Sequence, residues 1–188
     1  MLIREARKED APAIASFIVM AESEMMHLFF GTDDAGQSAA AVTEFILSPT
    51  PNRYSLENNL VAEIDGQTAG SIICFPADSQ PGLDTLLVGA LNRNGIRLDR
   101  LFFEGEPGTF YLSTMGVNPD FRGRGIGTAL LAAAEAKGAK LGFEAVSLLV
   151  SKDKGKAQAL YERLGFKVVA DVAIADVEYR RMTKRMAQ

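Results

Sequence analysis

Three glycines and two arginines come just before a helix-forming run in the segment FRGRGIGTALL, residues 121–131. A strand-like run, TFYLSTMGV (109–117), precedes it. The first N–H groups of a helix are unpaired and lie at the positive end of its dipole. Glycine lets a bulky anion approach such a backbone closely. This order of strand, glycine turn and helix therefore predicts a phosphate-binding loop, with Arg122 and Arg124 beside it, for a ligand that carries a pyrophosphate.

Two other phosphate-binding loops do not fit this segment. The loop of nucleotide hydrolases has the pattern GxxxxGK[ST], and no lysine follows Gly127. The dinucleotide fingerprint GxGxxG needs a third glycine where Thr128 stands, and Glu144 precedes the next strand instead of ending it. The sequence therefore disfavours nucleotide hydrolysis and dinucleotide redox chemistry.

Composition narrows the class of protein further. The 188 residues suit one domain with a sizeable core, and a net charge of −4 does not suit a general nucleic-acid binder. The single cysteine, Cys74, excludes an intramolecular disulfide and a cysteine-cluster metal site, and we expect no metal. The N-terminus lacks a signal-peptide core, and no run reaches the ~20 apolar residues of a membrane span. We expect a cytoplasmic protein with no nucleic-acid or membrane partner.

Hydrophobic periodicity predicts the elements that position the loop. Apolar residues spaced from Ile14 to Leu28 predict one amphipathic helical face, and Asp65-Gly66 predicts a hairpin between two β-rich runs. Residues 76–108 form an excursion between strands with a short helix near 84–91, and long excursions tend to carry function. The expected strands are 2–6, 60–64, 68–75, 109–117, 145–150, 166–175 and 177–182, and the other expected helices are 39–47, about 124–141 and 154–164.

Two patterns flank the glycine turn and identify a resemblance. The segment LSTMGVNPDFRG (112–123) leads into Arg122-x-x-Gly125-x-Gly127, and AQALYERLGF (157–166) follows about thirty residues later. With these motifs the chain resembles the GNAT superfamily of N-acetyltransferases. The motif-bearing match covers roughly residues 109–170, and the order of elements extends it over the whole chain.

The resemblance implies a fold and a co-substrate. The fold is α/β (α+β): a single GNAT-like domain over residues 1–188, with a mixed six- to seven-stranded sheet flanked by helices and two splayed parallel strands at the cofactor site. The co-substrate is acetyl-CoA. By position in the motifs, its expected contacts are Met115, Gly116, Val117, Arg122, Gly123, Arg124, Gly125, Ile126, Gly127, Thr128, Lys154 and Tyr161.

The resemblance also implies direct acetyl transfer to a primary amine of a small molecule or peptide. A backbone N–H near Val117 would polarise the thioester carbonyl, and Tyr161 would protonate the departing thiolate. Lys154 stands where relatives often carry asparagine, so that contact departs from the family pattern. A non-catalytic acetyl-CoA-binding sensor or interaction module of the same fold is the alternative reading.

A proton acceptor for the amine is not evident from sequence. Tyr111 stands about where some relatives carry a catalytic glutamate, and a phenol cannot act as a carboxylate base. Glu104 and Glu106 are of interest because they lead into a strand, and His27 is the only histidine. The full set of candidate carboxylates is Glu22, Glu24, Glu44, Glu63, Asp84, Glu104 and Glu106.

None of the motifs above marks the groove that would bind the amine acceptor. Residues 25–30 (MMHLFF) and 76–108 could shape this groove, since the family builds it from the first helices and nearby loops. They could equally belong to the core or to the interface of a homodimer, because methionine and aromatic residues suit both.

Overall fold

The computed structural model describes residues 1–174 and 177–186, and leaves the side chain of Glu24 undescribed. One mixed sheet forms the centre, in the order β1-β2-β3-β4-β5-β7-β6. All neighbouring strands in it are antiparallel except β4 and β5. The strands are β1 (Leu2–Glu5), β2 (Asn59–Ile64), β3 (Gln67–Pro76), β4 (Phe110–Val117), β5 (Ala145–Ser151), β6 (Lys167–Ile174) and β7 (Val177–Arg185).

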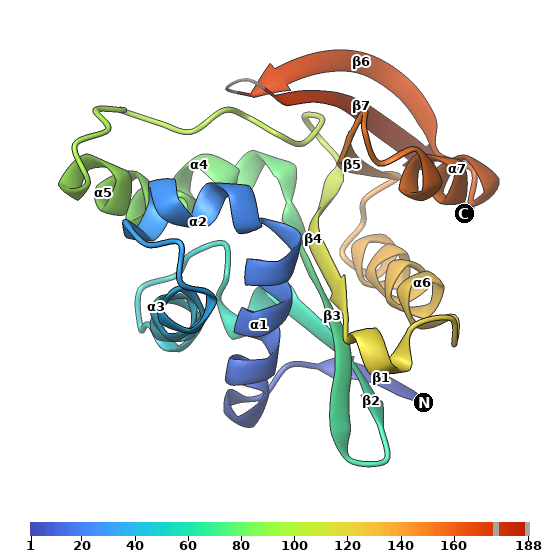
Figure 1. Cartoon of the computed structure of the whole chain (residues 1–188). Coiled ribbons are helices and arrows are strands. Elements are labelled where there is room, and N and C mark those ends of the chain that lie inside the picture. Colours follow the sequence, from blue (N-terminus) through green and yellow to red (C-terminus); the bar gives the residue numbers. More distant parts are fainter. Residues whose placement is uncertain (175–176, 187–188) are drawn as a thin grey trace.

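Helices cover both faces of this sheet. Figure 1 shows α1 to α5 on one face and α6 on the other, with α7 near β5 and β7. In the described residues, no helix is long and apolar enough to cross a bilayer. The helices are α1 (Ala11–Ala21), α2 (Ser23–Phe30), α3 (Ala35–Leu47), α4 (Gln80–Leu83), α5 (Thr85–Arg93), α6 (Ile126–Lys140) and α7 (Gly155–Arg163), with short 3-10 turns at 8–10, 56–58, 77–79 and 119–121.

Alternation along the strands divides the core into two layers. Ile73 and Phe75 of β3 pack with the cluster under α1, α2 and α3. Their neighbours Ile72 and Cys74 pack with the cluster under α6. Successive side chains of a strand point to opposite faces, so one buried strand serves both layers. The predicted mixed α/β fold with a six- to seven-stranded sheet is confirmed by this seven-stranded arrangement.

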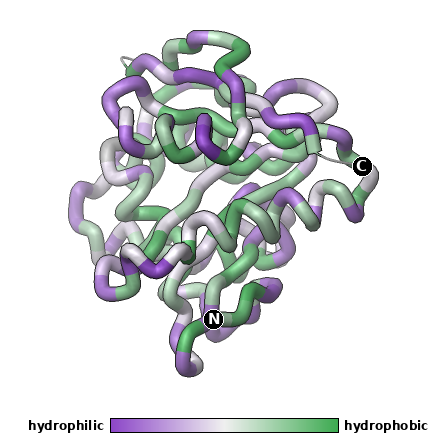
Figure 2. Tube along the Cα trace, turned by 90° about the vertical axis from the view of Figure 1, so that its right-hand side faces the viewer, coloured by the Kyte–Doolittle hydropathy of each residue, from purple (hydrophilic) through white to green (hydrophobic). Residues whose placement is uncertain are grey.

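The hairpin between β2 and β3 forms as predicted. Ile64 pairs with Gln67, and the two residues between them, Asp65 and Gly66, have φ of 51° and 76°. Positive φ at both central positions matches the twist of paired strands, and it explains the Asp-Gly dipeptide. The turn lies at the bottom of both views, and its tip is hydrophilic in Figure 2.

The first amphipathic segment differs from the prediction. The expected continuous face from Ile14 to Leu28 is divided into α1 and α2, and the break falls at Glu22, whose φ and ψ are −119° and 27°. The physical reason is a tertiary contact: the Glu22 carboxylate accepts hydrogen bonds from Tyr54 and Thr114, which lie far away in sequence. Periodicity within one helix carries no information on such contacts.

Other boundaries shift by smaller amounts. Helix α3 begins at Ala35 instead of residue 39, because the Asp34 side chain accepts the N–H of Gln37 at 2.7 Å and caps the helix. The excursion contains α4 and α5, so the short helix predicted near 84–91 is confirmed. The predicted end of the sixth strand at Ala175 lies outside the described residues.

Strands β4 and β5 separate partway along their length. They pair in parallel only from Phe110 to Leu112 of β4, although that strand continues to Val117. On the other side, the pairing of β4 with β3 shifts register opposite Ile72–Cys74 and then continues to Val117. The sheet is therefore open between β4 and β5 beyond Leu112, as the family resemblance implied.

Close packing of α1 on β4 explains one glycine of the motif strand. A Cβ on Gly116 would lie 2.6 Å from the Cβ of Phe17 and 3.0 Å from its carbonyl oxygen. We expect Gly116→Ala to lower the free energy of unfolding by about 1–3 kcal/mol because helix and strand must move apart. Urea denaturation measures this loss. Gly82→Ala is the matched control, since a Cβ there meets no atom within 4 Å; equal losses in both variants would contradict the packing argument.

Candidate active site

A cavity of about 610 Å³ occupies the opening between the splayed strands. Its walls include β4 from Tyr111 to Met115 and β5 from Leu148 to Ser151. Among the predicted cofactor contacts, Met115, Lys154 and Tyr161 border it. The opening thus brings together residues from the strand before the glycine turn and from the helix after β5.

The glycine turn encloses a second, smaller hollow of about 210 Å³. Gly123 and Gly125 both have φ of 75°, a left-handed conformation that other residues adopt only with strain. Gly125 is the N-cap of α6, so the unpaired N–H groups of the first helical turn lie at this hollow. Its lining residues are Val117, Phe121, Arg122, Gly123, Gly125, Ile126, Gly127, Thr128 and Leu160.

The backbone of β4 presents two of the predicted groups to the opening. The N–H of Asn118 donates to the carbonyl of Ala69 at 2.9 Å, so this residue directs its backbone groups toward β3. Successive residues of a strand direct their N–H groups to opposite edges. The N–H groups of Val117 and Met115 therefore face the side from which β5 has departed.

Two of the predicted cofactor contacts, Gly116 and Arg124, line neither hollow. Gly116 pairs with Ser71 of β3 and packs against Phe17, so its position serves helix–strand packing. Arg124 borders neither hollow, and its guanidinium lies 5.1 Å from the centre of the Phe121 ring. Arg122 does border the glycine hollow.

Tyr161 projects from α7 into the cavity. Its ring makes an edge contact with Phe166, with centroids 5.9 Å apart, and burial raises the pKa of its hydroxyl. Within the described part of the chain, its hydroxyl has no hydrogen-bond partner. A half-buried phenol that stays protonated and has a free hydroxyl can donate a proton to a group in the cavity.

Three of the candidate carboxylates gather at the end of the cavity near α2. Glu22 and Glu104 line the cavity itself, and Asp84 lies behind them. The side chain of Glu24 is outside the described set. The remaining candidates do not line the cavity: Glu44 is exposed on α3, Glu63 pairs with Arg4 at 2.7 Å, Glu106 pairs with Arg181 at 3.3 Å, and His27 is exposed beside Asp33.

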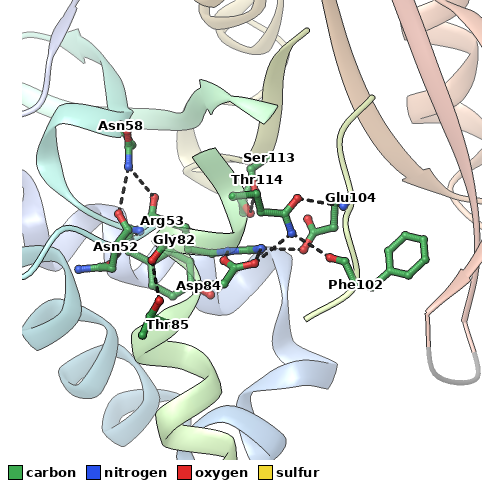
Figure 3. A network of polar contacts seen from close by, with 12 residues as sticks. Asn52, Arg53, Asn58, Gly82, Asp84, Thr85, Phe102, Glu104, Ser113 and Thr114 are labelled. Carbon is green, nitrogen blue, oxygen red and sulfur yellow. Dashed lines mark hydrogen bonds and ion pairs between the residues drawn. The ribbon is translucent and has the colours of Figure 1, made fainter. Parts of the chain in front are cut away.

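Sequence reasoning missed the buried arginine that organises this end of the cavity. Arg53 donates from Nε and Nη2 to both oxygens of Asp84, at 2.5 and 2.8 Å, and from Nη2 to Glu104 at 2.8 Å. Figure 3 shows Arg53 reaching both carboxylates. Gln80 adds a contact from its side-chain amide to Asp84 at 3.0 Å.

Hydrogen bonds with Arg181 and Gln80 fix the segment before β4 over the sheet. Arg181 of β7 donates to the carbonyls of Phe103 and Glu104, at 2.8 and 3.0 Å. The N–H of Glu104 donates to Gln80 at 2.9 Å. These contacts set the Glu104 side chain at the cavity, so part of the predicted excursion borders the candidate site. In the described residues, no group of three or more His, Cys, Asp or Glu forms a metal site.

Comparison with known families identifies the family of this chain. The model of the acetyltransferase (GNAT) family matches residues 23–166. The chain belongs to this family. The matched region contains the glycine turn, the splayed strands and the helix that carries Tyr161, so the features described above are those that the family model covers.

Solved structures extend the GNAT likeness over the whole chain. A crystal structure described as that of an acetyltransferase is 34% identical, covers 98% of this chain and 99% of its own, and has a TM-score of 0.79. An N-acetyltransferase from Staphylococcus aureus Mu50 has a TM-score of 0.82 at 20% identity, with 97% and 100% coverage, which shows the shared fold.

Curated relatives match a shorter stretch. A mycothiol acetyltransferase of Clavibacter michiganensis is 38% identical over 104 residues, which are 55% of this chain and 33% of that protein. One from Propionibacterium freudenreichii is 41% identical over 80 residues, 42% of this chain and 25% of that protein. The chain spans a third or less of the length of these relatives, so their acceptor is not carried over to it.

Proposed function

We propose that this chain is an acetyl-CoA-dependent N-acetyltransferase that acts on a primary amine of a small molecule or peptide. The observation that carries the proposal is continuity along β4. Met115 borders the large cavity and Val117 borders the glycine hollow, so one extended ligand can occupy both. Acetyl-CoA has this form, with a pyrophosphate near its middle and a thioester at one end.

The residues present fit this co-substrate. The left-handed glycines hold the start of α6 open, and Arg122 lies beside the hollow to balance phosphate charge. The N–H of Val117 would stabilise negative charge on the thioester oxygen. Lys154, the N-cap residue of α7, would contact acetyl-CoA. Acetyl-CoA, when bound, supplies the activated acetyl group.

Tyr161 would act as the general acid, and its removal gives a specific prediction. Tyr161→Phe keeps the ring contact with Phe166 but removes the proton donor. We expect kcat to fall about 100-fold while the Kd for acetyl-CoA stays within about twofold. Steady-state kinetics and calorimetry measure the two quantities. A large loss of thermal stability with proportionate loss of CoA binding would assign Tyr161 to the core instead.

A panel of primary amines tests the proposed activity. The protein is incubated with acetyl-CoA and each amine or peptide, and free thiol is followed with a colorimetric reagent. Thiol release that depends on both the protein and an amine supports the enzyme. Tight acetyl-CoA binding with no release above background would favour the non-catalytic sensor or interaction module, which none of the comparisons supports. A cytoplasmic setting and a homodimer stay part of the proposal.

A further inference from the structure

Two carboxylates at the end of the cavity near α2 are held in fixed positions by hydroxyl donors. Tyr54 donates to Oε2 of Glu22 at 2.9 Å, and Thr114 of β4 donates to Oε1. Tyr111 of β4 donates to Oε2 of Glu104 at 2.7 Å. Both carboxylates border the cavity, so their oxygens are oriented before any ligand enters.

The charge at this end of the cavity is not balanced. Arg53 is the one cation in contact with these carboxylates among the described residues, and both oxygens of Asp84 already pair with it. Glu104 shares the same guanidinium, and Glu22 makes no ion pair with it within 4.0 Å. At the far end of the cavity Lys154 lies beside Asp153 in sequence. A buried negative charge without a partner is costly, so the site favours an incoming cation.

The remaining walls combine apolar side chains with polar ones such as Ser23 and Ser113. Met20, Met25 and Phe29 line the cavity from the first two helices, and Ile174 and Val177 line it from the other side. A ligand here can place an apolar body against these hydrophobic side chains and a charged group at the carboxylates. This combination suits an ammonium group on a hydrocarbon carrier.

We infer that Glu22 and Glu104 form the acceptor subsite, which takes a primary ammonium on an apolar body with no carboxylate beside the nitrogen, and that Glu22 accepts its proton. The inference rests on the proposed acetyl transfer and adds a class of acceptor to it. Free amino acids are disfavoured because their carboxylate would lie against the carboxylate pair. Amines and amides of the same skeleton carry no such charge.

The proton balance assigns a separate role to each group. The amine nitrogen forms a bond to the acetyl carbon, and the carbon–sulfur bond breaks with its electron pair on sulfur. Of the two protons that the ammonium loses, one goes to Glu22 and then to solvent. The other also goes to solvent, and Tyr161 regains from solvent the proton that it gives to the thiolate. Burial raises the pKa of Glu22, and a raised pKa makes a carboxylate a better proton acceptor near neutral pH.

Three matched acceptors test the subsite. 2-Phenylethylamine, phenylalanine amide and phenylalanine share one skeleton and differ in the group next to the amine. We expect kcat/KM to be at least ~10-fold lower for phenylalanine than for the other two, because it alone brings a like charge to the subsite. Equal kcat/KM for all three would overturn the inference.

Two variants separate the roles of the carboxylates, with 2-phenylethylamine as the acceptor. We expect Glu22→Gln to lower kcat about 100-fold and to shift the acidic limb of the pH profile upward, so that the rate keeps rising until the pKa of the amine is reached. Glu104→Gln should raise KM for the amine about 10-fold and narrow the discrimination against phenylalanine. Glu44→Gln is the matched control, because Glu44 is an exposed helical glutamate outside the cavity.

Acetyl-CoA affinity and thermal stability are measured for every variant, so that misfolding is recognised. If Glu22→Gln does not fold, Thr114→Val tests the same point by freeing one oxygen of Glu22, and it should shift the acidic limb. Wild-type kinetics and an unchanged pH profile in Glu22→Gln would overturn the role of Glu22. Absence of thiol release from every amine with wild-type protein would instead contradict the proposed function.

Discussion

Gly127→Glu is expected to weaken acetyl-CoA binding by at least about 100-fold while the protein stays folded. Gly127 lies in the first turn of α6, and its φ is not in the left-handed region. A Cβ at this position would meet the Met115 methyl at 3.5 Å, an ordinary contact. The added carboxylate would therefore lie beside the glycine hollow and repel the pyrophosphate, because like charges in a confined site cost several kcal/mol.

Calorimetric titration with acetyl-CoA measures this loss. Gly127→Ala is the control: it adds the Cβ without charge and should keep the affinity within a few-fold. Gly125 is less suitable, since its φ of 75° would add backbone strain to the effect of charge. Unchanged affinity in a folded Gly127→Glu would show that the pyrophosphate binds elsewhere.

Arg53→Met should lower the free energy of unfolding by about 3–5 kcal/mol at pH 7. The variant leaves Asp84, whose side chain is 3% exposed, as a buried carboxylate without its cation. The cost arises because a buried charge without its partner loses its hydration and gains no compensating attraction. Urea denaturation at pH 7 measures the loss.

A double variant separates the ion pair from simple loss of packing. Arg53→Met combined with Asp84→Asn removes both charges, so it should be less destabilised than the sum of the two single variants. Additive losses would mean that the charge of Asp84 is not what the arginine stabilises.

The features that could be predicted from sequence are those that short segments determine. The glycine turn is local: the spacing of Gly123, Gly125 and Gly127 and the helix that follows fix the shape of the hollow. The Asp65-Gly66 hairpin is local in the same sense. The separation of β4 and β5 was predicted only from the family motifs, because no property of either strand alone requires it.

The carboxylate subsite could not be predicted because distant segments build it. Glu22 is held by residues 32 and 92 positions away, and Arg53 joins carboxylates 31 and 51 positions away. One signal was nevertheless present. Ile14, Ile18 and Glu22 follow at a spacing of four, so a carboxylate stands on an otherwise apolar helical face. A charged residue at such a position needs a buried partner or a function.

Transfer of a labelled acetyl group tests the central claim most directly. The protein is mixed with 2-phenylethylamine and with acetyl-CoA whose acetyl group carries a heavy isotope. The products are then separated, identified and quantified by mass spectrometry. The proposed function predicts that the isotope appears in the N-acetylated amine in amounts equal to the free CoA released, and that Gly127→Glu abolishes both. Release of CoA with the isotope in free acetate alone, or no release from any primary amine tested, would contradict it.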